Sequence, residues 1–424
     1  MQYTLKAPDK LHTTVTLPAS KSISNRALMI FALSRNNAFS LSDADLLPHN
    51  LSDCDDTNVI VRALKDRPYE IDIMAAGTAM RFMTAYLSVS DGEHVLTGTE
   101  RMKHRPIKIL TDALRYLGAD IAYIGEEGFP PLRIKGRRLE GGMLEIPGNV
   151  SSQYISALLL IGPVLEKGLV LKLTGDIISR PYIDLTLHTM HDFGAKADWT
   201  DVDTISVAPC GYKQREYLIE NDWSAASYWY ELMAIHNDPD DEITLQGLAD
   251  GSRQGDSVVR YLFSMLGVKT MFANTDAGVP TTVTLKKVKK RLPRLDYDFV
   301  NQPDLAQTFV VSCCLMDVPF KFTGLATLKI KETDRIAALQ NEMRKLGYVI
   351  EEQNGSELSW NGARCEPTLE PIETYEDHRM ALAFAPACLK FEGLRINEPQ
   401  VVTKSYPRYW DDLKQAGFII EKTQ

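Results

Sequence analysis

The sequence has few cysteines and no long apolar run. Its six cysteines include no pair at C-x-x-C spacing, and no histidines stand at zinc-site spacing, which disfavours a disulfide framework and a zinc fold. The longest apolar runs are far shorter than the roughly 20 residues that a membrane-spanning helix needs. The N-terminal residues also lack the basic and apolar regions of a signal peptide. We therefore expect a reduced, cytoplasmic protein with no membrane segment.

Several nucleotide and hydrolase motifs are missing as well. The chain contains no G-x-x-x-x-G-K-[ST], G-x-G-x-x-G, H-E-x-x-H or G-x-S-x-G sequence, so neither a P-loop, a dinucleotide fold, a zinc protease nor a serine hydrolase is indicated. Basic residues are fewer than acidic ones, 47 against 56, giving a net charge of −9. This balance argues against nucleic acid or an acidic membrane as a partner, although it allows a local cationic pocket.

One pattern recurs along the 424 residues. A short strand-like run ends in a turn, and a helix rich in small residues then begins with polar groups; the six starts lie near residues 20, 76, 151, 222, 303 and 377. Repeats of this kind, roughly 55 to 80 residues apart, predict several copies of one α/β unit. Helices rich in Ala, Ser, Thr and Met can pack closely on all sides. We therefore predict two α/β domains of three units each, with these helices inside and sheets outside.

The first helix start is the most informative. Residues 18–26 read PASKSISNR and place Lys21 and Ser22 in the first turn of the predicted helix. The positive end of the helix dipole disfavours lysine there unless something anionic is close. Arg26 and three serines complete a plausible phosphate cradle. This segment alone supports two interpretations equally, a serine-capped surface helix and a phosphate site.

Other helix starts shift that balance. Lys331-Glu-Thr-Asp-Arg335 alone is more typical of a charged surface helix, but Arg105 and Arg379 also stand at helix starts. Neutral donors occupy another start at residues 151–153, and Gly77 offers a backbone that an anion can approach closely. Cations repeated at helix N-termini indicate a ligand with several negative charges, such as phosphates or carboxylates.

These segments, taken in order, resemble the EPSP synthase family of the enolpyruvyl transferases. The resemblance covers the whole chain and is carried by nine motifs: PASKSISNR at 18–26, AGTAMR at 76–81, LTGTERMKHRP at 96–106, VSSQ at 150–153, SRPY at 179–182, QGD at 254–256, PD at 303–304, KETDR at 331–335 and DHR at 377–379. It implies two inside-out α/β domains of three βαβαββ units each, with the active site in the cleft between the domains. The expected domains are residues 1–18 plus 223–424 and residues 19–222.

The resemblance also implies a reaction. The enolpyruvyl group of phosphoenolpyruvate passes to the 5-hydroxyl of shikimate 3-phosphate by addition and elimination, and phosphate is released. Both substrates are small anions, which suits the cationic helix starts. The reaction needs no cofactor or metal, and we expect a monomer.

The resemblance assigns roles residue by residue. Catalytic roles fall to Asp304 as the base for the 5-hydroxyl, Glu332 at the methylene carbon and Lys21, with their division of acid and base work left open. Shikimate 3-phosphate is expected at Lys21, Ser22, Arg26, Ser151, Ser152, Gln153, Ser179, Tyr182, Asp304 and Lys331. Phosphoenolpyruvate is expected at Lys21, Gly77, Arg105, Gln153, Arg335, Arg379 and Lys404. Seven cations and two carboxylates give this site a formal charge of +5.

Three positions depart from the family pattern. Ala75 replaces an asparagine, Phe82 replaces the proline that follows the arginine of its helix, and Thr327 replaces an asparagine. They put substrate affinity and glyphosate sensitivity in doubt. The related UDP-N-acetylglucosamine transferases carry a reactive cysteine near residues 101–106, which this chain lacks. A non-catalytic binding protein is the alternative of a different class, and it would be favoured by loss of Asp304 or Glu332.

Overall fold

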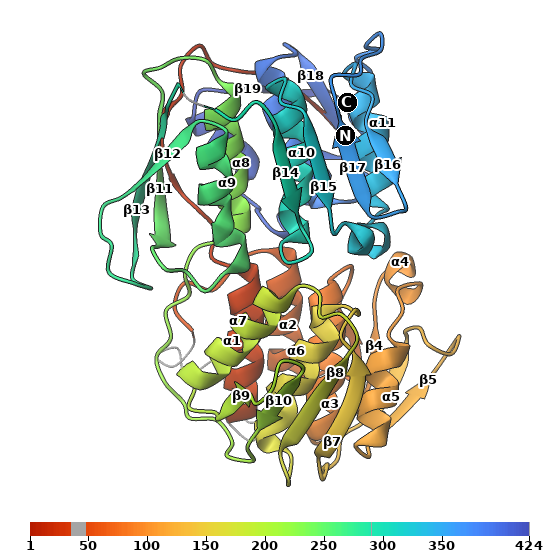
Figure 1. Ribbon diagram of the computed structural model, residues 1–424. Helices are drawn as coiled ribbons and strands as arrows, with labels where there is room; N and C mark the ends of the chain where they lie inside the picture. Colours follow the sequence, from red (N-terminus) through yellow and green to blue (C-terminus); the bar gives the residue numbers. More distant parts are fainter. Residues whose placement is uncertain (35–47, 290, 424) are drawn as a thin grey trace. The chain divides into compact units, whose positions relative to one another are not determined.

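The computed structural model describes residues 1–34, 48–289 and 291–423 and divides the chain into two compact units (Figure 1). Unit 1 comprises Met1–Pro18 and Glu220–Gln424, and unit 2 comprises Ala19–Ile219. Each unit has its own hydrophobic core of buried residues. The chain therefore leaves unit 1 after Pro18 and returns to it at Glu220.

Unit 1 combines short strands with mostly short helices. Its strands are β1 (Gln2–Lys6), β2 (His12–Thr16), β11 (Glu242–Ala249), β12 (Val268–Phe272), β13 (Pro280–Lys287), β14 (Leu295–Asp298), β15 (Phe320–Thr323), β16 (Glu351–Gln353), β17 (Glu357–Trp360), β18 (Leu394–Asn397) and β19 (Ile419–Thr423). Its α-helices are α8 (Trp223–Ile235), α9 (Val259–Met265), α10 (Ala306–Leu315), α11 (Arg335–Lys345), α12 (His378–Phe384) and α13 (Tyr409–Gln415).

Unit 2 is built in the same style. Its strands are β3 (Glu70–Asp72), β4 (Glu93–Thr97), β5 (Asp120–Tyr123), β6 (Leu132–Lys135), β7 (Gly142–Pro147), β8 (Leu169–Thr174), β9 (Ala197–Trp199) and β10 (Thr204–Val207). Its α-helices are α1 (Lys21–Ser34), α2 (Asp55–Asp66), α3 (Gly77–Val89), α4 (Glu100–Lys103), α5 (Lys108–Tyr116), α6 (Ser152–Ile161) and α7 (Arg180–Asp192).

The sheets repeat one pairing scheme. Four sheets of four strands have the orders β7-β8-β10-β9, β2-β11-β13-β12, β14-β15-β17-β16 and β3-β4-β6-β5. In each of them the first pair is parallel and the next two pairs are antiparallel. The sheet β18-β1-β19 continues the scheme, because Ile372 forms a parallel bridge to Ile396 beside two antiparallel pairs. The protein is thus a mixed α/β fold of several small mixed sheets.

The predicted inner helices are confirmed. Every residue of α10 and α12 is buried, and α8 is buried except at Ser224. Figure 1 shows α8 and α10 flanked by strands of unit 1. The same burial holds in unit 2, where α6 is exposed to solvent only at Ser152 and Gln153 in its first turn. Helices buried on all sides leave their N-terminal turns as the places where polar side chains can meet a ligand.

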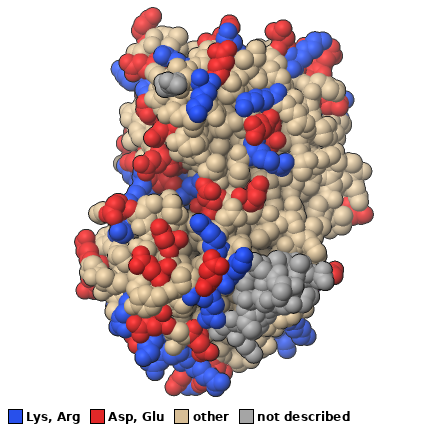
Figure 2. All heavy atoms as spheres, turned by 180° about the vertical axis from the view of Figure 1, so that it is seen from behind, with Lys and Arg blue, Asp and Glu red and all other residues tan. Residues whose placement is uncertain are grey.

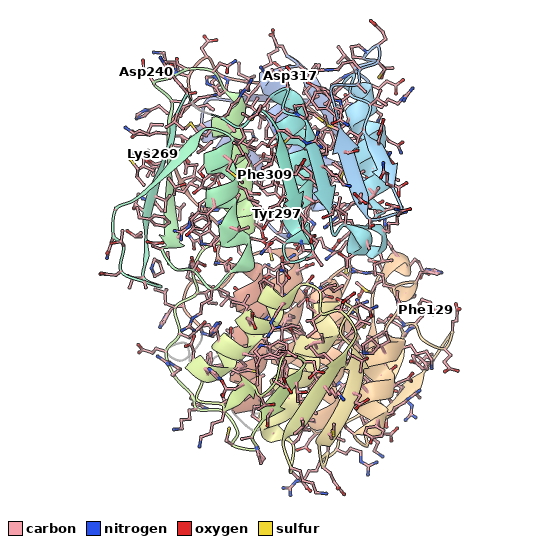
Figure 3. All side chains as sticks on the ribbon, viewed as in Figure 1. Phe129, Asp240, Lys269, Tyr297, Phe309 and Asp317 are labelled. Atoms are coloured by element: carbon pink, nitrogen blue, oxygen red, sulfur yellow. The ribbon has the colours of Figure 1, made fainter. Side chains whose placement is uncertain are left out.

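Aromatic packing holds the centre of unit 1 together. The ring of Phe309 on α10 lies 4.5 Å from that of Phe263 on α9 and 5.7 Å from that of Phe299, measured between centroids. Figure 3 labels Phe309 among the side chains near α9 and β14. Such a fully buried cluster fixes the helix starts in place because core side chains pack at crystal-like density.

The outer surface carries charges of both signs. On the face shown in Figure 2, Lys and Arg lie beside Asp and Glu, and neither sign forms a broad continuous patch there. Among the helices of the described residues, none is long and apolar enough to cross a membrane.

Candidate active site

The first helix start of unit 2 forms as predicted. Helix α1 begins at Lys21, and the buried hydroxyl of Ser20 accepts a hydrogen bond from the backbone N–H of Ile23 at 3.4 Å. The Lys21 ammonium lies 3.0 Å from the carboxylate of Asp56, a buried residue in the first turn of α2. Asp56 therefore supplies the anion that makes lysine acceptable at this helix end. Sequence reasoning did not find it, because the pairing spans 35 residues.

Arg26 is buried among neutral partners. Its Nε donates to Thr186 Oγ1 at 2.7 Å, Nη1 donates to the Ser22 carbonyl at 2.9 Å, and Nη2 donates to Ser156 Oγ and the Tyr182 carbonyl at 3.3 and 3.1 Å. Burial lowers the pKa of Arg26 to about 10, so the guanidinium stays charged at neutral pH. Of its five N–H donors, one on Nη1 has no acceptor among the described residues.

Two further helix starts of unit 2 are joined by an amide. Ser151 caps α6 by accepting the N–H of Gln153, and Gln153 Nε2 donates to Thr78 Oγ1 in the first turn of α3 at 3.1 Å. The absent side chain of Gly77 makes room for Arg105, since a Cβ there would lie 2.7 Å from Arg105 Nη1. A guanidinium held over a helix N-terminus adds its charge to the positive end of the dipole.

Ser179 and Tyr182 lie at the start of α7. Ser179 precedes this helix with a left-handed φ of 54°, and its hydroxyl makes no capping hydrogen bond. Tyr182 enters the Arg26 group through its carbonyl, which accepts a hydrogen bond from Nη2, and its phenol also acts electrostatically on the pKa of Arg26. The structure thus places these two predicted residues beside the same helix start.

In unit 1, Arg335 gathers three carboxylates. Its Nε and Nη2 bind both oxygens of Asp377 at 2.7 and 3.1 Å, Nη2 also donates to Glu332 at 3.0 Å, and Nη1 donates to Asp304 at 3.2 Å. Burial acts to lower the pKa of Arg335, but these negative charges outweigh it and raise the pKa. As in Arg26, one Nη1 donor has no acceptor among the described residues.

Asp304 is surrounded by cations. Besides Arg335, the Arg379 guanidinium donates to it at 2.9 Å and the Lys331 ammonium lies 3.6 Å away. Burial acts to raise the pKa of Asp304, but the three cations outweigh it and hold the pKa well below its usual range. Glu332 lies beside this group and pairs with Lys404 at 3.3 Å. The structure therefore brings together all six site residues predicted in this unit.

Asp256 is a further acid in this cluster. It is buried, accepts a hydrogen bond from Ser224 Oγ at the start of α8, and lies in the field of Asp304 and Arg379. Burial and the charge of Asp304 raise the pKa of Asp256 to about 6. Its QGD motif was visible in the sequence, but nothing there indicated that it would lie beside Asp304.

Within each unit the structure adds carboxylates to the predicted site residues. Three that the sequence count omitted, Asp56, Asp256 and Asp377, lie beside these cations. The four cations of unit 1 face four carboxylates and are balanced. Of the three cations of unit 2, Lys21 pairs with Asp56, while Arg26 and Arg105 have no carboxylate partner among the described residues, so the excess charge belongs to unit 2.

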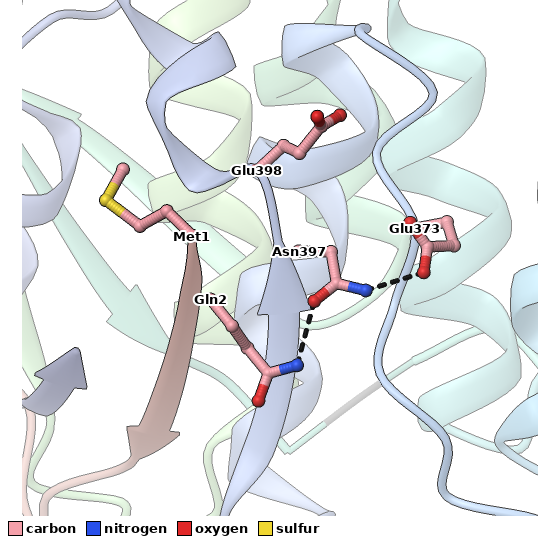
Figure 4. A pocket seen from close by; sticks show the side chains of 5 residues that line it. All are labelled: Met1, Gln2, Glu373, Asn397 and Glu398. Atoms are coloured by element: carbon pink, nitrogen blue, oxygen red, sulfur yellow. Dashed lines mark hydrogen bonds between the residues drawn. The ribbon is translucent and has the colours of Figure 1, made fainter. Parts of the chain in front are cut away.

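A small open pocket elsewhere in unit 1 contains none of these residues. It is lined by Met1, Gln2, Glu373, Asn397 and Glu398 (Figure 4). The Gln2 amide donates to Asn397, and the Asn397 amide donates to Glu373, at 2.8 and 2.6 Å. These polar groups satisfy one another, so the pocket gives no sign of a ligand. Nor does any group of three or more His, Cys, Asp or Glu in the described residues form a metal site.

Comparison with known proteins places this geometry in context. The family described as EPSP synthase (3-phosphoshikimate 1-carboxyvinyltransferase) matches residues 65–413. The chain is 57% identical over 422 residues to a 3-phosphoshikimate 1-carboxyvinyltransferase of Bacteroides fragilis (strain ATCC 25285), covering 99% of each chain. It is 34% identical to the enzyme of the same name from Photobacterium profundum, covering 98% of each.

Solved structures agree on the fold. EPSP synthase from Acinetobacter baumannii superposes with a TM-score of 0.76 at 21% identity, covering 100% of both chains. The enolpyruvyl transferase NikO from Streptomyces tendae gives 0.70 at 14% identity, covering 100% of this chain and 98% of that one. At such identities these two similarities support a shared fold.

Proposed function

Because the chain belongs to the EPSP synthase family, we propose that it is a 3-phosphoshikimate 1-carboxyvinyltransferase of the shikimate pathway. It transfers the enolpyruvyl group of phosphoenolpyruvate to the 5-hydroxyl of shikimate 3-phosphate and releases phosphate. The observation that carries this proposal is full-length identity of 57% to a relative of that name, together with both candidate acid/base residues inside one cationic cluster.

The same proposal includes the finer architecture. Each unit is an inside-out domain of three βαβαββ repeats, and the helix starts of both units serve one active site. Five sheets with one pairing scheme and buried central helices support it. The remaining repeat would include residues 35–47, which lie outside the described residues.

The helix starts of unit 2, with two residues of unit 1, hold shikimate 3-phosphate. Arg26 offers its remaining Nη1 donor, and the neutral acceptors around it leave its charge available to the anion. The other proposed contacts are Lys21, Ser22, Ser151, Ser152, Gln153, Ser179, Tyr182, Asp304 and Lys331.

The proposed contacts of phosphoenolpyruvate include a glycine-backed arginine of unit 2 and cations of unit 1. Arg105 lies over the start of α3 at Gly77, where guanidinium and helix dipole both favour a phosphate or carboxylate. The other proposed contacts are Lys21, Gln153, Arg335, Arg379 and Lys404.

The chemistry uses the two acids in turn. In the addition, Glu332 gives a proton to the methylene carbon of phosphoenolpyruvate, the 5-oxygen attacks the neighbouring carbon, and Asp304 takes the hydroxyl proton. In the elimination, Glu332 recovers a proton from the new methyl group, the carbon–oxygen bond to phosphate breaks, and the departing phosphate receives the proton held by Asp304. Lys21, at the start of α1, is the third proposed catalytic residue, and its proposed role is to assist proton transfer.

Asp304 becomes a better base when substrates bind. In the ligand-free protein its pKa is held down by three cations, which makes it a weak proton acceptor. The bound anions neutralise part of that positive charge, so they raise the pKa of Asp304 toward a useful value. This coupling would favour proton abstraction only after both substrates are in place.

The decisive experiment measures phosphate release from purified protein with shikimate 3-phosphate and phosphoenolpyruvate, together and separately. We expect release only with both substrates. Calorimetry of each substrate checks the alternative, a non-catalytic protein that holds a phosphorylated metabolite. Binding without any release would support that alternative and reject the enzyme.

A further inference from the structure

Phe82 occupies a position that the family pattern gives to proline. It lies in the middle of α3, is 1% exposed, and belongs to the core of unit 2. The guanidinium carbon of Arg26 lies over its ring, 5.6 Å from the ring centroid. That separation is within the range of a cation–π contact, in which the negative face of the ring attracts the cation.

Arg26 needs such a contact more than most arginines. It is 3% exposed, and its four acceptors are two hydroxyls and two backbone carbonyls, with no carboxylate partner among the described residues. Burying a charge without a counterion is costly unless other groups stabilise it. Among the described residues, four neutral hydrogen bonds, the phenol of Tyr182 and the face of the Phe82 ring stabilise the charge of Arg26.

As a partner for an arginine that binds an anion, the face of an aromatic ring is more suitable than a carboxylate. A carboxylate would occupy N–H donors and compete with the ligand for the same charge. The Phe82 ring attracts the guanidinium through its face and accepts none of the N–H edges, so the remaining Nη1 donor stays available.

We propose that Phe82 is a positioning residue of the ligand-free shikimate 3-phosphate site: its ring stabilises the charged Arg26 guanidinium in place, at some cost in affinity, until the anion takes over that stabilisation. This inference rests on the proposed role of Arg26. It makes Phe82, a departure from the family pattern, a working part of the substrate site in this chain.

Fluorinated phenylalanines at position 82 test the proposal at nearly constant shape. Mono-, di- and trifluorophenylalanine withdraw electron density from the ring face in steps, and chemical denaturation measures stability. Without ligand, the unfolding equilibrium constant should rise with each step, by about 5- to 30-fold for the most fluorinated ring. With saturating shikimate 3-phosphate the rise should be smaller, because the bound anion neutralises the guanidinium. By linkage, the dissociation constant of shikimate 3-phosphate should fall on fluorination, by the ratio of the rise measured without ligand to the rise measured with ligand.

The same series in an Arg26→Gln background is the control, and there the fluorine dependence should disappear. A series with no fluorine dependence, or with equal dependence in the Arg26→Gln protein, overturns the proposal and reduces Phe82 to a packing residue. Failure of the proposed function has a different signature. If Arg26→Gln leaves the dissociation constant of shikimate 3-phosphate unchanged, Arg26 is no ligand, and the positioning role falls even if the cation–π contact is real.

Discussion

Arg26 in unit 2 and Arg335 in unit 1 are both buried charges, but the fold stabilises them with different kinds of partner. Both guanidiniums are buried, and both use four of five donors within the described residues. Arg26 has neutral acceptors and a lowered pKa, whereas Arg335 has three carboxylate partners and a raised one. In unit 2 the Arg26 charge has no carboxylate partner among the described residues. In unit 1 the Arg335 charge holds three carboxylates in place.

This difference separates binding from chemistry. An arginine with neutral partners exerts its full charge on an incoming phosphate. An arginine already neutralised by three carboxylates binds an anion less strongly, but it fixes Asp304 and Glu332 relative to each other. We infer that unit 2 supplies most of the affinity for shikimate 3-phosphate and that unit 1 supplies the proton transfers.

The sharpest test of that separation is Glu332→Gln. The amide keeps the size of the side chain but carries no proton to the methylene carbon, so kcat should fall by about 10²- to 10⁴-fold. The dissociation constant of shikimate 3-phosphate should change less than about threefold, because in our proposal unit 2 holds most of that ligand. Phosphate release and calorimetry measure the two effects. Exposed Glu366→Gln is the matched control, and equal losses of turnover and binding in Glu332→Gln would make Glu332 structural.

Asp377→Asn should have the next largest effect, on stability. Asp377 is fully buried and makes a bidentate pair with Arg335, so its loss leaves a buried cation short of negative charge. Breaking such a pair costs about 3–5 kcal/mol of unfolding free energy. Denaturant melts measure this cost, and Asp411→Asn at an exposed ion pair should cost less than about 1 kcal/mol. A cost for Asp377→Asn no larger than for that control would contradict a carboxylate-held Arg335.

These partners mark the limit of what the sequence could predict. The helix starts at Lys21, Ser152 and His378 were predictable because turn, cap and hydrophobic signals lie within a few residues of one another. Roles for Arg26 and Arg335 could be predicted because the motifs that contain them are local. Their partners Thr186 and Asp377 lie 160 and 42 residues away, and no local pattern indicates which polar residue a buried guanidinium will meet.

The unit 1 acids also predict how stability changes with pH. The folded protein holds the proton of Asp256 up to about pH 6, against a usual pKa of 3.8. Between these values the folded state binds more protons than the unfolded chain, so stability falls as the pH rises, by about 3 kcal/mol in total. Asp304 acts in the opposite direction, because its lowered pKa stabilises the fold above about pH 4 and that stability is lost on acidification.

Asp256→Asn separates the two acids. Denaturant melts from pH 3 to pH 8 measure the unfolding free energy of this variant. We expect that free energy no longer to fall between pH 4 and pH 6, while it still falls on acidification below pH 4. If the unfolding free energy of Asp256→Asn still fell between pH 4 and pH 6, another group would cause that fall, and the raised pKa of Asp256 would be contradicted.

The smallest predicted effect tests the neutral shell of Arg26 itself. Thr186 is fully buried; its hydroxyl accepts the Nε of Arg26, donates to the Tyr182 carbonyl and lies 2.8 Å from Ser156 Oγ. Thr186→Val keeps the shape but removes a hydrogen bond to a charged group, worth about 1.5–3 kcal/mol of unfolding free energy. Thr189→Val is matched on the same helix, since Thr189 is buried and its hydroxyl has the Leu185 carbonyl as its sole partner among the described residues. That control should cost less, and equal costs would mean that the neutral shell contributes nothing specific to the guanidinium.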